Sequence, residues 1–463
     1  MVTNRKARWA QKRLRLSVLA LALICITGVA FAQGNTTASI AKSSVASLAE
    51  QDSQAPVTVT LADALQRAKT NSPQFRAALT EYGVAREDRV QARAALLPSV
   101  TYNNQYLYTE GNGTPIPRFI ANNAVHEYIS QGNAHEVVGW TPIADYRRTL
   151  AAEAGARARA EIAARGLVVT VVQNYYALIS SQRKYATTQQ ASQEAQRFLK
   201  ISQDLERGGE VAHADVVKAQ LQFNDRQRDL RDAQLNMERA RIELALLLFP
   251  NFNQNFEVVD DIDHVTAVPP LDQVEEQAKK NNPQLASAMA VLREAAGALG
   301  VARSAYLPTL ALDYWYGIDN SHFAVHEPFP SGMRNLGNSA SATLNIPIWN
   351  WGTTHSRIKQ GELRRNQAKL ELSFAQRRFL GDLHTLYAEA ETVHAELETL
   401  RQSAELAAES LRLTTLRYQG GESTVLEVVD AQNTLTSARN AYDDGQARYR
   451  VALANLQTLT GSF

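Results

Sequence analysis

Mostly hydrophobic side chains recur at alternating spacings of three and four residues over the C-terminal part of the chain. Ten such positions follow in register, namely Leu383, Leu386, Ala390, Val393, Leu397, Leu400, Ala404, Ala407, Leu411 and Thr414. This spacing is the seam of a coiled coil and predicts one long helix over about 350–418. A second amphipathic run starts at Val425 and predicts a returning helix.

Gly420 and Gly421 separate these two runs. Because glycine tolerates the positive φ that a tight helix reversal needs, we expect a long helical hairpin with this pair at its tip. Two acids, Glu427 and Asp430, lie just past the tip. The hairpin with its acidic tip is therefore the first candidate for function.

The chain carries an internal repeat. Leu61–Tyr102 aligns without a gap to Leu271–Leu312 at an offset of 210, and Gly208-Gly209 matches Gly420-Gly421 at an offset of 212. The matches include Ala68 with Ala278, Asn71-Ser-Pro73 with Asn281-Asn-Pro283, Ala92-Arg93 with Ala302-Arg303, and Leu97-Pro98 with Leu307-Pro308. The sequence is therefore a tandem duplication, with repeats expected over 57–260 and 261–463.

Each repeat predicts the same order of elements. A short helix and a second helix come first, and the second stops at Leu-Pro because a residue before proline leaves the helical region. Two β segments, a very long helix, a Gly-Gly break and a returning helix complete the repeat. The expected helices are 61–70 and 271–280, 73–96 and 283–306, 145–206 and 350–418. At about 1.5 Å per residue the long helices reach about 90–105 Å, which is typical of a coiled-coil tube.

The β segments are candidates for crossing a membrane. They are expected over 100–109, 133–141, 309–318 and 339–346, and three of them alternate apolar or aromatic residues with polar ones, as an outer-membrane barrel requires. The segment 133–141 alternates poorly, and a soluble antiparallel sandwich is the alternative. Four strands cannot close a barrel, whereas three chains would supply twelve. The loops 110–132 and 319–337 would face outward.

The N-terminus predicts export. Residues 1–32 carry six basic residues and no acid, then an apolar run and Ala30-Phe31-Ala32, which together are typical of a cleaved signal peptide. Its removal changes the net charge from +1 to about −5. Residues 33–56 lack periodicity and predict a flexible lead-in. No later run reaches 18 consecutive apolar residues, so we expect no transmembrane helix after the signal.

Composition and motifs argue against several other functions. The single cysteine, Cys25, lies in the signal and comes after Ile24, which disfavours a lipid anchor and leaves the mature chain without thiols. Enzyme motifs such as G-x-S-x-G, the P-loop and H-E-x-x-H are absent. We therefore expect no enzyme, no cofactor and no metal site, and the acidic mature chain disfavours nucleic acid. The histidines considered for metal were His126, His135, His322, His326, His384 and His394.

In this order the motifs resemble those of the TolC-type outer-membrane efflux channels, from Thr60 to Gly461. The most specific are the duplicated Asn-x-Pro and Leu-Pro units, Asn345-Ile-Pro-Ile348, and Tyr418-x-x-Gly421 with Val429-Asp430-Ala431-Gln432 after it. The resemblance implies a mainly α homotrimer with a periplasmic helical barrel, a mixed α/β girdle and a shared twelve-stranded β-barrel in outer-membrane lipid. It also implies a periplasmic adaptor and an inner-membrane RND or ABC transporter as partners.

The resemblance also assigns roles at the tips. Glu427 and Asp430 match two acids that ring the family's periplasmic mouth, and Tyr418 matches an aromatic residue that helps hold it closed. The i, i+3 spacing places both acids on one helix face, and a ring of carboxylates favours cations. The alternative is that both acids only favour the N-terminal turn of their helix. Ser423 stands where the family has a latch arginine.

The two tips differ in charge. At an offset of 212, the first-repeat counterparts of the acids are Asp215 and Lys218, which should largely cancel, so the acidic ring is expected in the second repeat only. The small-residue tips, Gly208, Gly209, Gly420 and Gly421, are expected to contact the adaptor.

These observations predict a passive outer-membrane exit duct of a tripartite efflux system for small molecules such as drugs, toxic organics or metal ions. One alternative is the outer-membrane channel of a type I protein secretion system. Another is an exported coiled-coil scaffold that never enters a membrane, which detergent-dependent solubility would exclude.

Overall fold

The computed structural model describes residues 56–108, 126–264, 266–326, 332 and 334–461. The expected signal peptide, and the lead-in except for residue 56, lie outside these ranges. The larger compact unit consists of Val59–Phe252 and Val258–Phe463, and Asn253–Glu257 belong to a smaller one. Two short strands, β1 (Val57–Val59) and β4 (Phe256–Val258), pair with each other.

The helices repeat in length and order. They are α3 (Leu61–Asn71), α4 (Pro73–Ala94), α5 (Trp140–Arg207), α6 (His213–Leu248), α7 (Leu271–Asn281), α8 (Pro283–Ser304), α9 (Thr353–Gln419) and α10 (Val425–Thr460). Matched helices have 11 and 11, 22 and 22, 68 and 67, and 36 and 36 residues. Ser72 and Asn282 cap α4 and α8 in the same way, each just before a proline in the first turn. The predicted helices are confirmed.

The predicted coiled-coil seam of α9 is also confirmed. All ten of its positions are buried or partly buried, and Leu383, Ala390 and Val393 have almost no exposed surface. The seam packs against α10, where Gly445 lies so close to Leu400 that a Cβ would meet its side chain at 2.7 Å. A glycine here lets the two helices approach closely.

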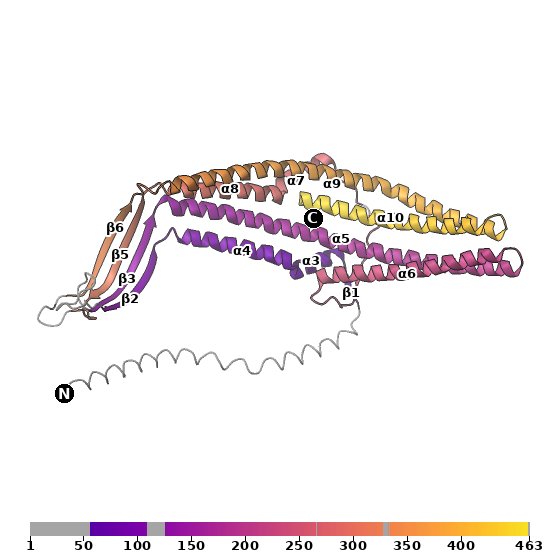
Figure 1. The fold of residues 1–463 in the computed structure, drawn as a ribbon, viewed down its shortest axis with the longest axis horizontal. Coiled ribbons are helices and arrows are strands. Elements are labelled where there is room, and N and C mark those ends of the chain that lie inside the picture. The colour runs from indigo at the N-terminus through magenta and orange to yellow at the C-terminus, as the bar shows by residue number, and fades with distance from the viewer. Residues whose placement is uncertain (1–55, 109–125, 265, 327–331, 333, 462–463) are drawn as a thin grey trace, which may run out of the picture. The chain divides into compact units, whose positions relative to one another are not determined.

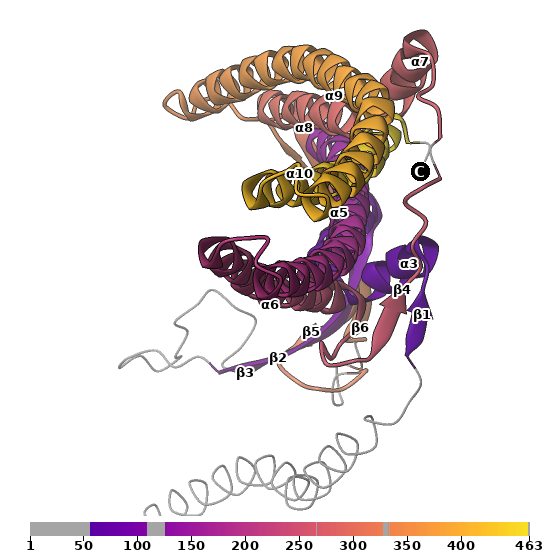
Figure 2. The ribbon, with the colours of Figure 1, turned by 90° about the vertical axis from the view of Figure 1, so that its right-hand side faces the viewer.

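The long helices of the larger unit lie side by side in a layer (Figure 1). Next to the strands the order across the layer is α4, α5, α8 and α9, and farther away it is α6, α5, α10 and α9. α5 therefore has helical neighbours on both flanks along its whole length, whereas α9 forms one edge. The short helices α3 and α7 lie on one side of the layer (Figure 2).

One antiparallel sheet contains the four strands β2 (Ser99–Tyr108), β3 (His126–Val138), β5 (Thr309–Asn320) and β6 (Leu336–Asn345), in that order. Its register places Val100, Ala134, Tyr314 and Ala340 in one row across the sheet, on the same face. Side chains of this face are largely exposed, among them Val100 and Tyr314. The outer edges of β2 and β6 have no strand partner within the described residues.

One predicted strand was misplaced. The segment expected over 133–141 is β3, which spans 126–138, so the loop expected over 110–132 is shorter and His126 and His135 lie in a strand. Pro142, which follows the expected strand directly, lies in the first turn of α5. Proline is tolerated there because first-turn N–H groups have no intrahelical partner.

Two helical stretches, one in α5 and one over 271–304, are long and apolar enough to cross a membrane by length and composition alone. The expectation that no transmembrane helix follows the signal was based on runs of consecutive apolar residues. A test on helix length and mean hydropathy finds these two stretches, so it does not support that expectation. Both stretches belong to helices that pack within the larger unit.

Candidate functional site: the hairpin tips and the contacts between hairpins

The two hairpin tips have nearly the same backbone. Gly209 and Gly421 both have φ of 76°, and the amides of Glu210 and Glu422 donate to the carbonyls of Leu205 and Arg417 at 2.9 Å. This is the six-to-one bond of a Schellman motif, which a residue with positive φ allows. The expected glycine reversal is confirmed, and only the second glycine of each pair needs the special conformation.

The tips differ in the residues that start the returning helix. In the second hairpin, Thr424 caps α10 in a reciprocal box: its hydroxyl accepts from the Glu427 amide at 3.3 Å, and the Glu427 carboxylate accepts from the Thr424 amide. Ser423 donates to the same carboxylate at 2.8 Å. In the first hairpin, Ala212 precedes α6 and provides no side-chain cap. The second tip is therefore the more firmly built.

The electrostatics of Glu427 are set mainly by these bonds. The Ser423 hydroxyl, and after it the bonds to Thr424, hold the pKa of Glu427 below its usual range. Arg417, which also donates to the Glu422 carbonyl, lies 4.0 Å from the Glu427 carboxylate. The expectation that both acids are uncompensated is therefore wrong for Glu427, whose carboxylate has a cation beside it.

Asp430 keeps the expected character. It is exposed, and no hydrogen bond or ion pair joins it to another residue in the described parts of the chain. In the first hairpin, Lys218 lies 3.5 Å from Asp215, so the expected internal pairing forms. The charge asymmetry between the hairpins thus comes mainly from Asp430.

Tyr418 lies in the interface between the two hairpins of one chain. Its side chain is 3% exposed, its ring centroid is 5.0 Å from that of Phe198, and its hydroxyl lies 3.2 Å from the hydroxyl of Ser202. Ser202 is completely buried, so Tyr418 is its only route to a hydrogen bond outside its own helix among the described residues. Tyr418 therefore fastens α9 to α5 near the tips.

A second polar link between the hairpins was not predicted. Asn433 on α10 accepts hydrogen bonds from Arg226 and from Gln222 of α6, the latter at 3.3 Å. The Arg226 side chain is almost buried and also lies 3.2 Å from Asp229. Arg226 is one of many charged residues in α6, so the sequence alone does not distinguish it. Only the packing of α6 beside α10 shows that it is buried.

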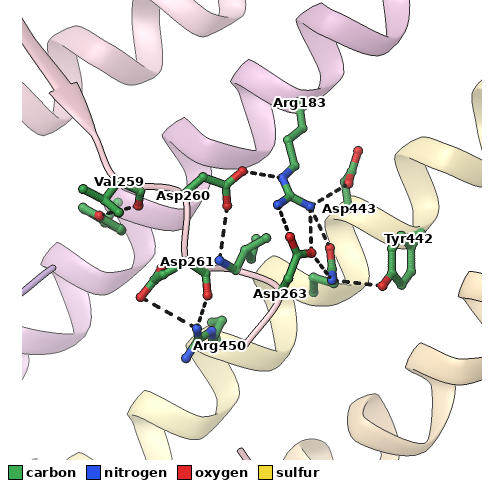
Figure 3. Close-up of polar contacts among 11 residues, drawn as sticks. Arg183, Val259, Asp260, Asp261, Asp263, Tyr442, Asp443 and Arg450 are labelled. Carbon is green, nitrogen blue, oxygen red and sulfur yellow. Dashed lines mark hydrogen bonds and ion pairs between the residues drawn. The ribbon is translucent and has the colours of Figure 1, made fainter. Parts of the chain in front are cut away.

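A third link lies farther from the tips, where residues Val259–His264, here called the strap, cross α5 and α10. Arg183 of α5 lies 2.7 Å from Asp260 and 2.8 Å from Asp263 of the strap, and 3.5 Å from Asp443 of α10 (Figure 3). Arg450 of α10 donates to the carbonyl of Asp261. The strap thereby joins the first hairpin to the second.

Burial raises the pKa of two groups near the strap. It raises the pKa of Asp443 despite the nearby Arg183, and it raises the pKa of Tyr175 to about 12. The Tyr175 hydroxyl donates to the carbonyls of Val259 at 2.7 Å and of Val59 at 3.3 Å. Tyr175 is therefore a neutral donor that positions the backbone at both ends of the first repeat.

No group of three or more His, Asp or Glu side chains that could hold a metal occurs in the parts of the chain that the structure describes. Two of the histidines that were considered as metal ligands have other partners. His135 lies 2.7 Å from Asp313 across two strands, and His394 packs on the ring of Tyr449.

Exposed aromatic residues gather where the sheet meets the helices. Trp140, Trp349 and Trp351 are 60%, 76% and 88% exposed, and the rings of the last two meet edge to face at 5.9 Å. Ile348, next to Trp349, is 90% exposed. Tryptophan is enriched where a membrane meets water, so this group of aromatic residues, here called the aromatic belt, is a candidate for such a boundary.

Comparisons with known proteins agree with this geometry. Residues 274–462 match the family model described as outer membrane efflux protein. The chain is 22% identical over 422 residues to the alkaline protease secretion protein AprF of Pseudomonas aeruginosa, covering 87% of this chain and 84% of AprF. It is 21% identical over 407 residues to the outer membrane protein TolC of Escherichia coli, covering 86% and 81%.

The solved outer membrane channel CmeC of Campylobacter jejuni has the same fold, with a TM-score of 0.75 at 16% identity over 87% of this chain and 85% of CmeC. The family model matches most of the second repeat, and the similarities to AprF, TolC and CmeC extend over both repeats. The matched family model is one of outer membrane efflux proteins, and CmeC is an outer membrane channel. These similarities confirm the expected resemblance of the chain to the TolC-type outer-membrane efflux channels.

Proposed function

We propose that this protein is the passive outer-membrane exit duct of a tripartite efflux system and carries small molecules from the periplasm or an inner-membrane transporter to the exterior. One observation carries the proposal: a four-stranded sheet with an exposed apolar face continues into a helical layer about 100 Å long. The first part suits lipid and the second suits the periplasm.

The open sheet supports a homotrimer. An unpaired strand edge cannot lie in lipid, because its N–H and C=O groups find no water there. Three copies joined through β2 and β6 would give twelve strands, an even number within the range of such barrels.

The edges of the helical layer support the same assembly. On α9, Leu363, Leu370 and Phe374 are 61%, 71% and 58% exposed, and on α4 at the opposite edge Leu79 and Val90 are 44% and 47% exposed. A second copy that packs its α4 edge against this α9 edge would bury both. Such head-to-tail contacts close into a ring when the rotation between copies allows it.

At the tips of this assembly, Glu427 and Asp430 of three chains would form an acidic gate, with Tyr418 holding the second hairpin in place. Asp430 would carry most of the cation preference, since Arg417 lies beside Glu427. We propose a periplasmic adaptor as the partner at the tips and an RND or ABC transporter as the energy source behind it.

The adaptor contact can be tested without straining the tips. Gly208 and Gly420 have φ of −75° and −84°, so they accept a side chain, whereas Gly209 and Gly421 do not. Gly208→Gln with Gly420→Gln should leave trimer stability unchanged and reduce efflux and adaptor crosslinking. Unchanged crosslinking would contradict the contact.

One-step protein secretion is the second candidate, because the similarity to the alkaline protease secretion protein AprF covers most of both chains. The tube itself would serve either cargo. Expression with an efflux pump or with a protein exporter, each in a host that lacks its own duct, decides between them: drug resistance supports efflux, and a secreted protease supports secretion.

The duct itself is tested with the purified full chain in detergent and in planar bilayers. We expect a trimer by chemical crosslinking, heat-modifiable migration and defined ion conductance. Leu370→Glu should dissociate the trimer, while Phe323→Glu, which changes a side chain of similar exposure in the β5–β6 loop, should not. A soluble protein that shows no conductance and remains monomeric would refute the proposal.

A further inference from the structure

Charge is unevenly distributed along the helical layer. The half next to the sheet consists of α4, α8, residues 140–165 of α5 and residues 353–380 of α9, and it holds eighteen Lys and Arg against nine Asp and Glu. The other half, with α6, α10 and the rest of α5 and α9, holds seventeen against twenty. The strand-proximal half of each chain therefore carries a large positive excess.

A groove of about 590 Å³ lies in this basic half, over α5 and between α4 and α8. Small side chains form its floor, including Ala151 and Ala154 of α5, and Gly297 brings α8 within close contact of Arg148. The size suits a small molecule or a head group.

Three arginines line the groove: Arg147, Arg157 and Arg293. All three are exposed, and within the described residues no hydrogen bond or ion pair joins any of their side chains to a protein group. The one acid of the lining, Glu153, is already paired with Arg89 at 2.6 Å. Three like charges without counter-charges around an apolar floor favour an anionic ligand.

The groove opens on the side of the layer that carries the strap. Exposed residues of α5 near the groove recur at spacings of three and four, so positions seven apart share a face. Arg147 and Ala154 differ from Tyr175 by multiples of seven, and Tyr175 contacts the strap. When the layer closes into a tube, the strap and α3 would lie outside because they would otherwise fill the lumen.

The groove is also close to the aromatic belt. Arg147 is seven residues after Trp140, the first residue of α5, which is about 10 Å along the helix. In the first turns of α5 side chains tilt back toward the helix N-terminus, and therefore toward the sheet. The polar head-group region of a bilayer is about 5–8 Å thick on each side, within reach of an arginine at this position.

We propose that this groove binds the head group of an anionic phospholipid from the periplasmic leaflet, with the phosphate on Arg147 and the rest of the head group directed toward Arg293. The floor of small side chains gives the head group room, and the basic half of the layer raises the local concentration of anionic lipid. The inference rests on the membrane insertion in the proposed function.

Tryptophan fluorescence can measure this binding. The chain has five tryptophans, of which Trp9 lies in the expected signal and the others, Trp140, Trp315, Trp349 and Trp351, lie in the sheet or at its junction with the helices. The full chain is reconstituted with brominated phosphatidylglycerol or brominated phosphatidylcholine, whose bromines quench nearby tryptophans. The ratio of quenching gives the preference for the anionic lipid.

We expect a preference of about 25-fold for phosphatidylglycerol in the parent protein and nearly none in Arg147→Gln with Arg293→Gln, since each of the two arginines contributes about fivefold near a membrane surface. The matched control, Arg231→Gln with Arg239→Gln, removes two exposed charges from α6 and should keep the preference. A preference that survives in the groove variant would overturn the proposal.

Two further measurements separate the alternatives. If millimolar glycerol phosphate removes the preference as completely as the groove substitutions do, the groove binds a soluble anion and the lipid assignment is wrong. Conductance is recorded from the same preparations. A parent protein that prefers the anionic lipid but conducts no ions would contradict the proposed duct while supporting the lipid site.

Discussion

Replacing Tyr418 by Phe tests whether contacts between the hairpins hold the proposed gate. The hydroxyl of Tyr418 lies 3.2 Å from that of Ser202, in a place where the Ser202 side chain is completely buried. Phenylalanine keeps the ring against Phe198 and removes only this bond. The substitution therefore weakens the contact between α9 and α5 without creating a cavity the size of a ring.

The expected magnitude depends on the burial of this pair. A neutral hydrogen bond contributes about 1 kcal/mol, and leaving a buried hydroxyl unpaired costs about 1–3 kcal/mol. About 1 kcal/mol shifts the equilibrium between docked and undocked hairpin about fivefold in each chain. If three chains open together, the effects add to about 3 kcal/mol, or about 150-fold. Tyr418→Ala also removes the ring and should cost about 3–5 kcal/mol per chain.

The assay is single-channel recording in planar bilayers together with thermal unfolding of the same trimers. Tyr418→Phe should raise the open probability or conductance, and Tyr418→Ala should raise it further. The matched control is Tyr442→Phe, which removes a hydroxyl that meets Gln446 within the same helix instead of joining α9 to α5. If Tyr418→Phe lowers the unfolding temperature but leaves channel opening at the parent level, the contact is structural and the gating role is refuted.

Three further predictions concern charge. Asp430→Asn should lower the preference for cations in bilayers more than Glu427→Gln does, and equal effects would contradict the compensation of Glu427. Because the pKa of Glu427 is lowered, its carboxylate should stabilise the capped tip at neutral pH. Protection factors for hydrogen exchange at the tip, which remove the pH dependence of the intrinsic exchange rate, should decrease only as pH falls below the usual glutamate range. Burial raises the pKa of Asp443 in the folded protein. Ionisation of this carboxyl therefore lowers the free energy of unfolding as pH rises through the raised pKa. Asp443→Asn should therefore raise the unfolding temperature at pH 7.5, with the gain shrinking toward pH 4; a gain independent of pH would exclude this cause.

Periodicity predicted the helices because the physics that places them is local. The three-four spacing on α9 and the Asn-x-Pro and Leu-Pro boundaries of α4 and α8 each depend on a few neighbouring residues. The same local reasoning misplaced β3. A strand's ends depend on its partners, and β3 reaches back to His126 because β2 and β5 pair with it over that length.

Sequence reasoning predicted only those parts of the candidate site whose contacts lie within one turn of the chain. The Gly-Gly reversals and the Asp215–Lys218 pair depend on neighbours within a turn. The contact of Arg226 with Asn433 joins residues 207 positions apart, and the contacts of Arg183 span 77 and 80 positions. The pairing depends on which helices lie side by side, and a single sequence does not specify that. The roles assigned to Glu427, Asp430 and Tyr418 stay predictions.

The packing gives a physical reason why the second hairpin, rather than the first, should move. α5 is covered along its length, by α4 and α8 in one half and by α6 and α10 in the other, and the strap crosses it through Arg183. α9 is an edge helix whose main helical neighbours are α8 and α10. Near the tips the two hairpins share an apolar cluster from all four helices, to which Phe198, Leu411 and Val428 belong. Tyr418 and Asn433 add polar contacts between the hairpins, each hydrogen bond contributing about 1 kcal/mol. A partner that undocks the second hairpin has to offset the burial of this cluster near the tips, whereas unpacking α5 would break contacts along its whole length.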